Sequence, residues 1–137
     1  MATWDDVARL ALALPETSED PEHGHHNWRG WKVKGKAFVW ERPLGRSDLR
    51  TLGDDAPPEG PILAARVEHE GAKRALIESD PEVFFTIPHF DGYPAILILL
   101  DRIGVQELKE VVVEAWLNRA PARVLKAYMS ERGGGEA

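Results

Sequence analysis

The feature that most constrains the fold is the segment AILILL at residues 95–100, which is apolar at every position. Successive side chains of a strand point to opposite faces of the sheet, so both alternating sets of this segment must be covered. The segment is far shorter than the run of about 20 apolar residues that a membrane-spanning helix needs. It therefore predicts an interior strand of a globular domain, and no membrane partner.

Further elements follow from periodicity and turn residues. Apolar spacing predicts helices over residues 4–14, 72–79, 105–120 and from 121 onward, with the glycine triplet at 133–135 ending the last one. Strands are expected at residues 62–67 and 82–86, and a hairpin within 27–43 should turn at Lys34 and Gly35. In this hairpin Val33 is expected opposite Lys36, Trp31 opposite Phe38, and Arg29 opposite Trp40. Residues 15–27 are expected to form a loop, and a single helical turn is expected after Ser47.

This order of elements predicts an α+β fold. We expect a compact single domain over residues 1–137, with one antiparallel sheet of about five strands packed with the N-terminal and C-terminal helices. Residues 131–137 are expected to be a disordered tail. The chain has no cysteine, which excludes disulfides and thiolate chemistry. The first residues lack the pattern of a secretory signal, so we expect a cytoplasmic protein, and we expect it to be a monomer.

The charge is unevenly distributed along the chain. The formal net charge is −6, yet residues 27–50 hold seven basic and two acidic residues, a local net charge of +5. Directly upstream, residues 15–22 contain four acidic residues and no basic one. A basic hairpin could contact a phosphate backbone, or its lysines could simply protect exposed strands from pairing. The candidate phosphate contacts are Lys32, Lys34, Lys36, Arg42 and Arg46.

The segment PHFDGY at residues 88–93 is the other candidate site. His89 and Asp91 could act as a base and its orienting partner, but the nearby hydroxyls belong only to Thr86 and Tyr93, and no nucleophile motif accompanies them. Asp-Gly is a turn dipeptide and Pro88 removes a backbone donor, so a turn that borders a pocket is favoured over catalysis. The pocket candidates are Pro88, His89, Asp91 and Tyr93, and no catalytic residue is predicted.

Three histidines, His23, His25 and His26, lie close together in the sequence. Imidazoles at this spacing can share a metal ion, but the cluster has no fourth ligand in view. We therefore predict no metal site and no cofactor.

Several segments together resemble the MmcQ/YjbR-like family from about Trp4 to about Tyr128. They are LALALPETSEDPEHGHHNWR, GKAFVWERP, DPEVFFTIPHFDGYPAILILLDRI and ELKEVVVEAWLNRAPARVL, and FFTIPHFDGYPAILI is the most specific part. The resemblance implies a CyaY-like, secretion-chaperone-like α+β fold and a double-wing protein described as DNA-binding. The motif of this family matches residues 88–93 and the turn at Gly35 and Lys36, and it carries no established catalytic residue.

The sequence thus predicts a non-catalytic binding module. Its expected ligand is nucleic acid, bound weakly and in a salt-sensitive way by the basic hairpin. The alternative is a protein–protein or small-ligand module that uses the pocket at residues 88–93 and has no nucleic-acid role.

Overall fold

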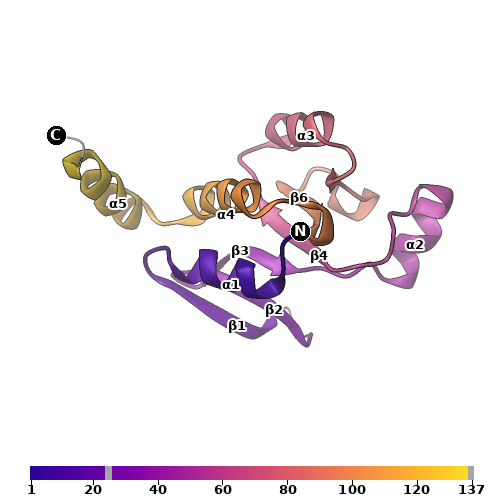
Figure 1. Ribbon diagram of the computed structural model, residues 1–137, viewed down its shortest axis with the longest axis horizontal. Helices are drawn as coiled ribbons and strands as arrows, with labels where there is room; N and C mark the ends of the chain where they lie inside the picture. The colour runs from indigo at the N-terminus through magenta and orange to yellow at the C-terminus, as the bar shows by residue number, and fades with distance from the viewer. Residues whose placement is uncertain (24–25, 136–137) are drawn as a thin grey trace.

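The computed structural model describes residues 1–23 and 26–135, and the side chains through residue 131. One antiparallel sheet of six strands runs through this part of the chain in the order β1-β2-β3-β4-β6-β5 (Figure 1). The strands are β1 (Thr17–His23), β2 (Trp28–Val33), β3 (Lys36–Glu41), β4 (Ile62–Arg66), β5 (Phe84–Phe85) and β6 (Ala95–Leu99). The helices are α1 (Trp4–Leu12), α2 (Arg46–Leu52), α3 (Glu70–Ser79), α4 (Val105–Arg119) and α5 (Ala122–Gly135), with short 3₁₀ turns η1 (Gly53–Asp55), η2 (Pro88–Phe90) and η3 (Leu100–Arg102). The α+β fold class is confirmed.

The apolar strand β6 lies inside the sheet, between β4 and β5, and all five of its residues are buried. Ile96 and Ile98 belong to the larger core, on the face that α1 and α4 cover. Leu97 and Leu99 belong to a second, smaller core on the opposite face. The prediction of a strand covered on both faces is therefore confirmed.

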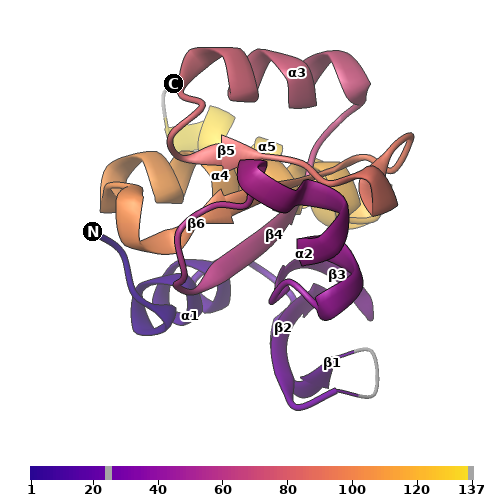
Figure 2. The ribbon, with the colours of Figure 1, turned by 90° about the vertical axis from the view of Figure 1, so that its right-hand side faces the viewer.

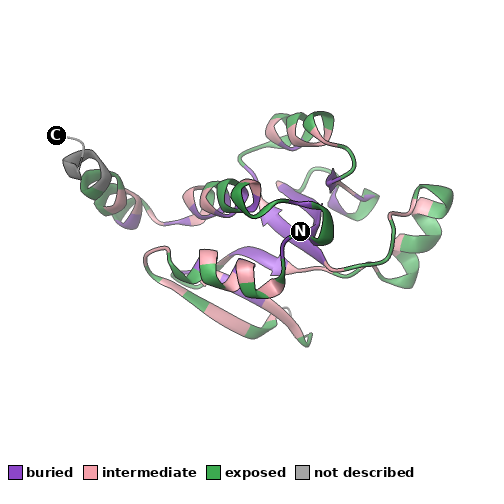
Figure 3. Ribbon diagram, in the orientation of Figure 1, coloured by how far each residue is buried: buried purple, intermediate pink, exposed green. Residues whose placement is uncertain are grey.

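The two faces of the sheet are covered to different extents. On one face, α4 packs against β3, β4 and α1, and the buried residues are concentrated beneath these helices (Figure 3). On the other face, η2 supplies Phe90 and the segment around α2 supplies the half-buried Leu44 and Leu52. This thinner cover leaves room for a cleft.

Residues 15–27 are not the loop that the sequence predicts, because β1 occupies Thr17–His23. β1 pairs with β2 from Thr17 opposite Val33 to His23 opposite Trp28. It lies at the edge of the sheet and all of its residues are exposed or only half-buried (Figure 3). A strand of this kind has no apolar alternation to reveal it, so the sequence-based prediction was wrong here.

The hairpin of β2 and β3 turns at the predicted residues. Lys34 and Gly35 both have positive φ, 49° and 82°, and Val33 faces Lys36 as expected. Beyond Lys32 the register shifts, so that Trp31 faces Val39 and Gly30 faces Trp40. The predicted pairs of Trp31 with Phe38 and of Arg29 with Trp40 are wrong by one residue, because an irregularity of the β-bulge type inserts an extra residue between the two halves.

Three helix ends also differ from the expectation. The first helix ends at Leu12, two residues early, and α2 is a helix of seven residues where a single turn was expected. α5 continues through the glycine triplet to Gly135, so these glycines do not end it. The disordered tail stays a prediction, and residues 136 and 137 lie outside the described part. Within residues 1–23 and 26–135, no helix has the length and apolar character needed to cross a membrane.

Candidate functional site

A cleft of about 770 Å³ opens on the thinly covered face of the sheet. Three segments that are distant in sequence form it: the ends of β1 and β2, the connection from β3 into α2, and the turn around η2. Figure 2 views the molecule from the end at which α2 lies. The lining residues are His23, His26, Trp28, Trp40, Arg42, Pro43, Leu44, Gly45, Asp48, His89, Phe90 and Tyr93.

Aromatic rings form most of the wall of this cleft. The ring centroid of Trp40 lies 5.4 Å from that of His23 and 6.4 Å from that of Tyr93. Phe90 meets Tyr93 edge to face, with a centroid separation of 5.4 Å. Such rings offer flat apolar surfaces with polar edges, which suits the stacking of another planar group.

Arg42 and Asp48 form the polar part of the wall. Arg42 Nη1 lies 3.3 Å from Asp48 Oδ2, and their side chains are only 15% and 13% exposed. The guanidinium carbon lies 5.8 Å from the ring centroid of Trp28 and 5.6 Å from that of Phe90, within the range of a cation–π contact. Arg42 is therefore held by a carboxylate and two rings, and its charge is already compensated.

The segment at residues 88–93 is a structured turn. η2 begins with Pro88, and Tyr93 N donates to Phe90 O at 3.0 Å. Asp91 has φ −59° and ψ 127°, and Gly92 has φ 76°, which are the angles of a type II turn. The turn interpretation is confirmed.

The turn brings two of its four pocket candidates to the cleft. His89 and Tyr93 line the cleft, whereas Pro88 and Asp91 are exposed and do not. Within the described part of the chain, no hydrogen bond or ion pair joins His89 to Asp91. The two side chains are therefore not arranged as a base and its orienting partner.

Lys73 of α3 anchors this turn, and the sequence analysis missed it. Its side chain is 3% exposed, and its Nζ donates to Phe90 O at 2.7 Å, Tyr93 O at 3.0 Å and Glu70 Oε1 at 3.2 Å. The ammonium group thus has an acceptor for each of its three protons. The sequence did indicate that this lysine lies on an inward face, because its spacing places it on the same side of the helix as the apolar Leu76 and Ile77.

Two of the three clustered histidines, His23 and His26, line the cleft, while His25 lies outside the described residues. Burial, and then the charge of Lys32, lower the pKa of His23, which favours its neutral form. A Cβ on Gly30 would lie 2.8 Å from the Cβ of His23, so glycine is required beneath this ring. No group of three or more potential metal ligands occurs among the described His, Cys, Asp and Glu residues.

The basic residues of the hairpin are largely paired with the acidic residues that precede them. Lys32 Nζ lies 3.0 Å from Asp20 Oδ2, and Lys34 Nζ lies 3.4 Å from Glu16 Oε2. The neighbouring Arg29 makes a bidentate contact with Glu19, at 2.9 and 3.0 Å. The acidic segment and the basic segment that follows it therefore lie side by side in β1 and β2, and most of their opposite charges are paired there.

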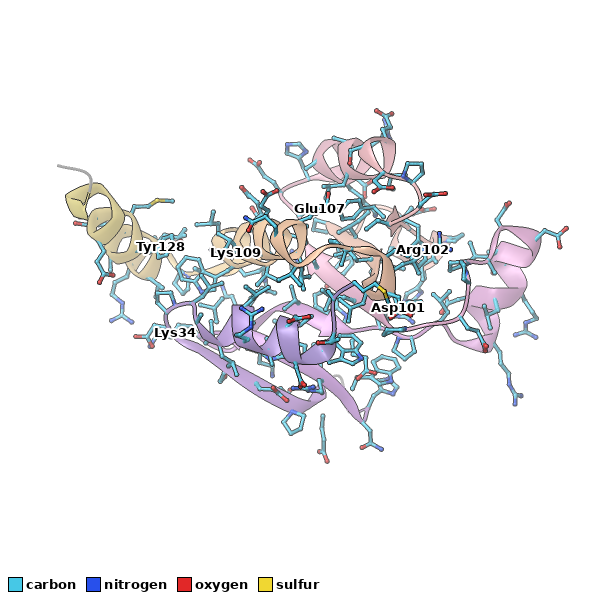
Figure 4. All side chains as sticks on the ribbon, viewed as in Figure 1. Lys34, Asp101, Arg102, Glu107, Lys109 and Tyr128 are labelled. Carbon is cyan, nitrogen blue, oxygen red and sulfur yellow. The ribbon has the colours of Figure 1, made fainter. Side chains whose placement is uncertain are left out.

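The five candidate phosphate contacts do not gather on one surface. Lys34 lies near one end of the long axis, and α2, which begins with Arg46, lies at the other (Figures 1 and 4). Arg42 lines the cleft. Lys36 and Arg46 are exposed and form no ion pair with a described residue.

Comparisons with known proteins agree with this fold. The crystal structure of a Deinococcus radiodurans protein with a DUF419 domain superposes with a TM-score of 0.62 at 19% identity, covering 85% of this chain and 78% of that one. At this identity the likeness shows the fold alone.

Sequence relatives extend over nearly the whole chain. Uncharacterized proteins of Mycobacterium bovis and Mycobacterium tuberculosis are 47% identical over 135 residues, covering 97% of this chain and 100% of theirs. The YjbR family model matches residues 12–118, a range that includes the hairpin, the turn at residues 88–93 and most of α4. The resemblance found in the sequence is thereby confirmed, and the chain belongs to the YjbR family.

Proposed function

We propose that this protein is a non-catalytic module that binds a planar aromatic small molecule in the cleft. The observation that carries the proposal is the meeting of Trp28, Trp40, Phe90 and Tyr93 around one cleft of about 770 Å³. This volume lies within the usual range of small-molecule pockets, which are lined mainly by apolar and aromatic side chains with a few polar groups.

The chemistry of the wall favours a ligand without a strong net charge. Arg42 and Asp48 already neutralise one another, and the pKa of His23 is lowered by its burial. Imidazole groups and the Arg42–Asp48 pair supply donors and acceptors for the edge of a ring, while the exposed Tyr93 and the half-buried Trp28 supply apolar ring surface. Among the lining residues the hydroxyl group is that of Tyr93, which accepts a hydrogen bond from Arg66, and within residues 1–23 and 26–135 no imidazole or carboxylate is hydrogen-bonded to it. This arrangement supports binding rather than catalysis.

The five tryptophans provide a direct test. Trp28 and Trp40 line the cleft, whereas Trp4 of α1 stacks on Trp31 of β2, and Trp116 packs against Tyr128. We would follow the five indole N–H signals by nuclear magnetic resonance while adding indole, adenosine or riboflavin, three planar compounds of increasing size. A ligand in the cleft should shift the signals of Trp28 and Trp40 and leave the other three unchanged.

Two variants separate this proposal from its alternatives. Tyr93→Ala removes one wall of the cleft and should weaken binding of the probe at least tenfold. Lys36→Glu changes an exposed charge outside the cleft and should leave binding unchanged. Equal shifts of all five indole signals, or no shift with any of the three probes, would contradict the proposal.

Nucleic-acid binding by the hairpin is a second candidate function. The observation that favours it is the exposed tip, where Lys34 lies in the turn and Lys36 directly follows it. The pair of Lys34 with Glu16 is 41% and 54% exposed, and such pairs contribute so little that a phosphate could replace the carboxylate. With two phosphate contacts at the tip, the log–log salt slope should be about −2.

Titration of a labelled DNA duplex at low salt tests this candidate. Lys36→Glu should abolish binding, while the matched control Lys126→Glu, an exposed lysine of α5, should not. An absence of binding at tens of micromolar protein would remove nucleic acid from consideration.

A further inference from the structure

A groove between α3 and α4 is separate from the aromatic cleft. It has a volume of about 470 Å³ and shares no lining residue with that cleft. α3 lies above α4 in both Figure 1 and Figure 2, and among the described elements it packs mainly against β5. The groove is therefore a space that the packing of α3 and α4 leaves open.

The floor of the groove is apolar. Val67, which follows β4, and Val111 of α4 are buried there, and Leu76 of α3 is half-buried. The other α3 residues of the lining are small, namely Ala72, Ala75 and Ser79. Because these side chains are short, the apolar floor stays accessible to a side chain that enters from outside.

The rim of the groove is acidic. The lining includes four glutamates and one basic residue, Arg66, whose guanidinium group donates to the hydroxyl oxygen of Tyr93. Glu107, Glu110 and Glu114 follow one side of α4 at spacings of three and four residues. None of the three forms an ion pair with a residue of the described part of the chain.

This arrangement is unfavourable for the protein on its own. Like charges three and four residues apart on a helix repel one another. Glu107 lies in the first turn of α4, where the helix dipole favours a carboxylate, but Glu110 and Glu114 lie beyond that turn. Glu68 adds a fourth negative charge from the segment after β4. Positive charges along the rim would relieve the repulsion, and apolar groups between them would cover the floor.

We propose that this groove binds an amphipathic helix of a partner protein, with apolar residues on one face and a lysine or arginine beside each turn of that face. The apolar residues of the helix pack on the floor of the groove, as in other helix-in-groove complexes. Its basic side chains pair with the glutamates of the rim. The aromatic cleft takes no part in this contact, so the proposal does not depend on what the cleft binds.

The dimensions of the groove favour a helix over a small organic cation. From Glu107 to Asn118 the lining runs along α4 for about 16 Å, or three helical turns. The carboxylates recur about once per turn, which is also the interval at which one face of a partner helix repeats its side chains. A small cation would contact only part of the rim and would leave most of the floor exposed.

A synthetic peptide serves as the probe. It is about 15 residues long, with leucines at helical spacing on one face and a lysine beside each turn of that face. A scrambled peptide of the same composition keeps the charge but has no apolar face. In titrations followed by fluorescence anisotropy, the amphipathic peptide should bind at least about tenfold more tightly than the scrambled one, and added sodium chloride should weaken it.

A variant of the floor tests whether the peptide enters the groove. Ala75→Trp fills the groove without changing its charge, so it should weaken binding by about tenfold or more. The matched control Ala127→Trp, at an exposed alanine of α5, should leave binding unchanged. If Ala75→Trp does not fold, Ser79→Trp, at an exposed position on the same side of α3, takes its place.

A variant of the rim tests the charge pairing. The double substitution of Glu110→Gln with Glu114→Gln should weaken binding by about fivefold, because each exposed ion pair contributes modestly. The matched control, Asp54→Asn with Asp55→Asn, removes two exposed carboxylates of η1 and changes the net charge equally, but should leave binding unchanged.

Four outcomes would overturn the proposal. They are an absence of binding at hundreds of micromolar peptide, equal affinity for the scrambled peptide, an unchanged affinity when tryptophan fills the groove, and an equal loss in the two double variants. The last result would show that the net charge of the protein, and not the rim of this groove, attracts the peptide.

Discussion

Replacing Lys73 by methionine tests how the turn at the cleft is held. Methionine retains most of the apolar stem but removes the ammonium group, so the carbonyl oxygens of Phe90 and Tyr93 each lose a charged donor and keep only a backbone amide as donor. A hydrogen bond to a charged group contributes about 1.5 kcal/mol or more, so two such bonds predict a loss of about 3 kcal/mol. The contact with Glu70 adds little because that carboxylate is 47% exposed. For a chain of 137 residues this loss corresponds to a Tm lower by about 10 °C.

Urea unfolding measures the change in free energy, and hydrogen exchange locates it. The amide of Tyr93, which donates to Phe90 O within the turn, should exchange faster in Lys73→Met. The exchange rates of amides in α4 should rise only by the amount that the lower global stability accounts for. Lys126→Met, which alters an exposed lysine of α5, should change the stability by less than about 0.5 kcal/mol. A Lys73→Met protein within the same 0.5 kcal/mol of the wild type would refute the assigned role of this lysine.

Two further predictions concern β1 and the turn. The hydrogen bonds from Arg29 lower the pKa of Glu19 in the folded protein. The contribution of the Glu19 carboxylate to the free energy of unfolding is therefore complete above the unfolded pKa of about 4.3, and it is lost as the pH falls through the lower folded pKa. The Tm of Glu19→Gln should consequently fall less steeply than that of the wild type below about pH 5, and parallel curves would contradict this. Gly92 has φ 76°, so Gly92→Ala should destabilise the protein by about 1 kcal/mol or more. Gly104→Ala, at φ −77° with open space around it, should lose only the preference for glycine over alanine at an N-cap, about 0.5 kcal/mol. Urea unfolding of both variants compares the two losses.

The elements with a strong apolar pattern could be predicted from the sequence. The strand at residues 95–99 could be predicted because all of its residues are apolar, and the helix from residue 105 because its apolar residues recur at helical spacing. β1 could not be predicted in this way, because an edge strand held by ion pairs to β2 buries no regular set of apolar residues. The register of the hairpin failed for a related reason, since no residue type marks the irregularity between Trp31 and Lys32.

The candidate site was predicted only in part. The turn at residues 88–93 was recognised from its prolines and its Asp-Gly dipeptide, and it does bring His89 and Tyr93 to the cleft. Trp28, Trp40 and Arg42 join them through long-range pairing, which no local pattern in a single sequence encodes. The acidic and basic segments were noted separately, and only the pairing of β1 with β2 shows that most of their charges cancel.

The central claim is that the aromatic cleft is the binding site, and intermolecular nuclear Overhauser effects test it most directly. We would use whichever of indole, adenosine and riboflavin shifts the indole signals most, bound to the wild-type protein. The account predicts contacts from the protons of the bound ring to Trp28, Trp40 and Tyr93. Contacts confined to Trp4 or Trp116, or to the lysines at the tip of the hairpin, would contradict it.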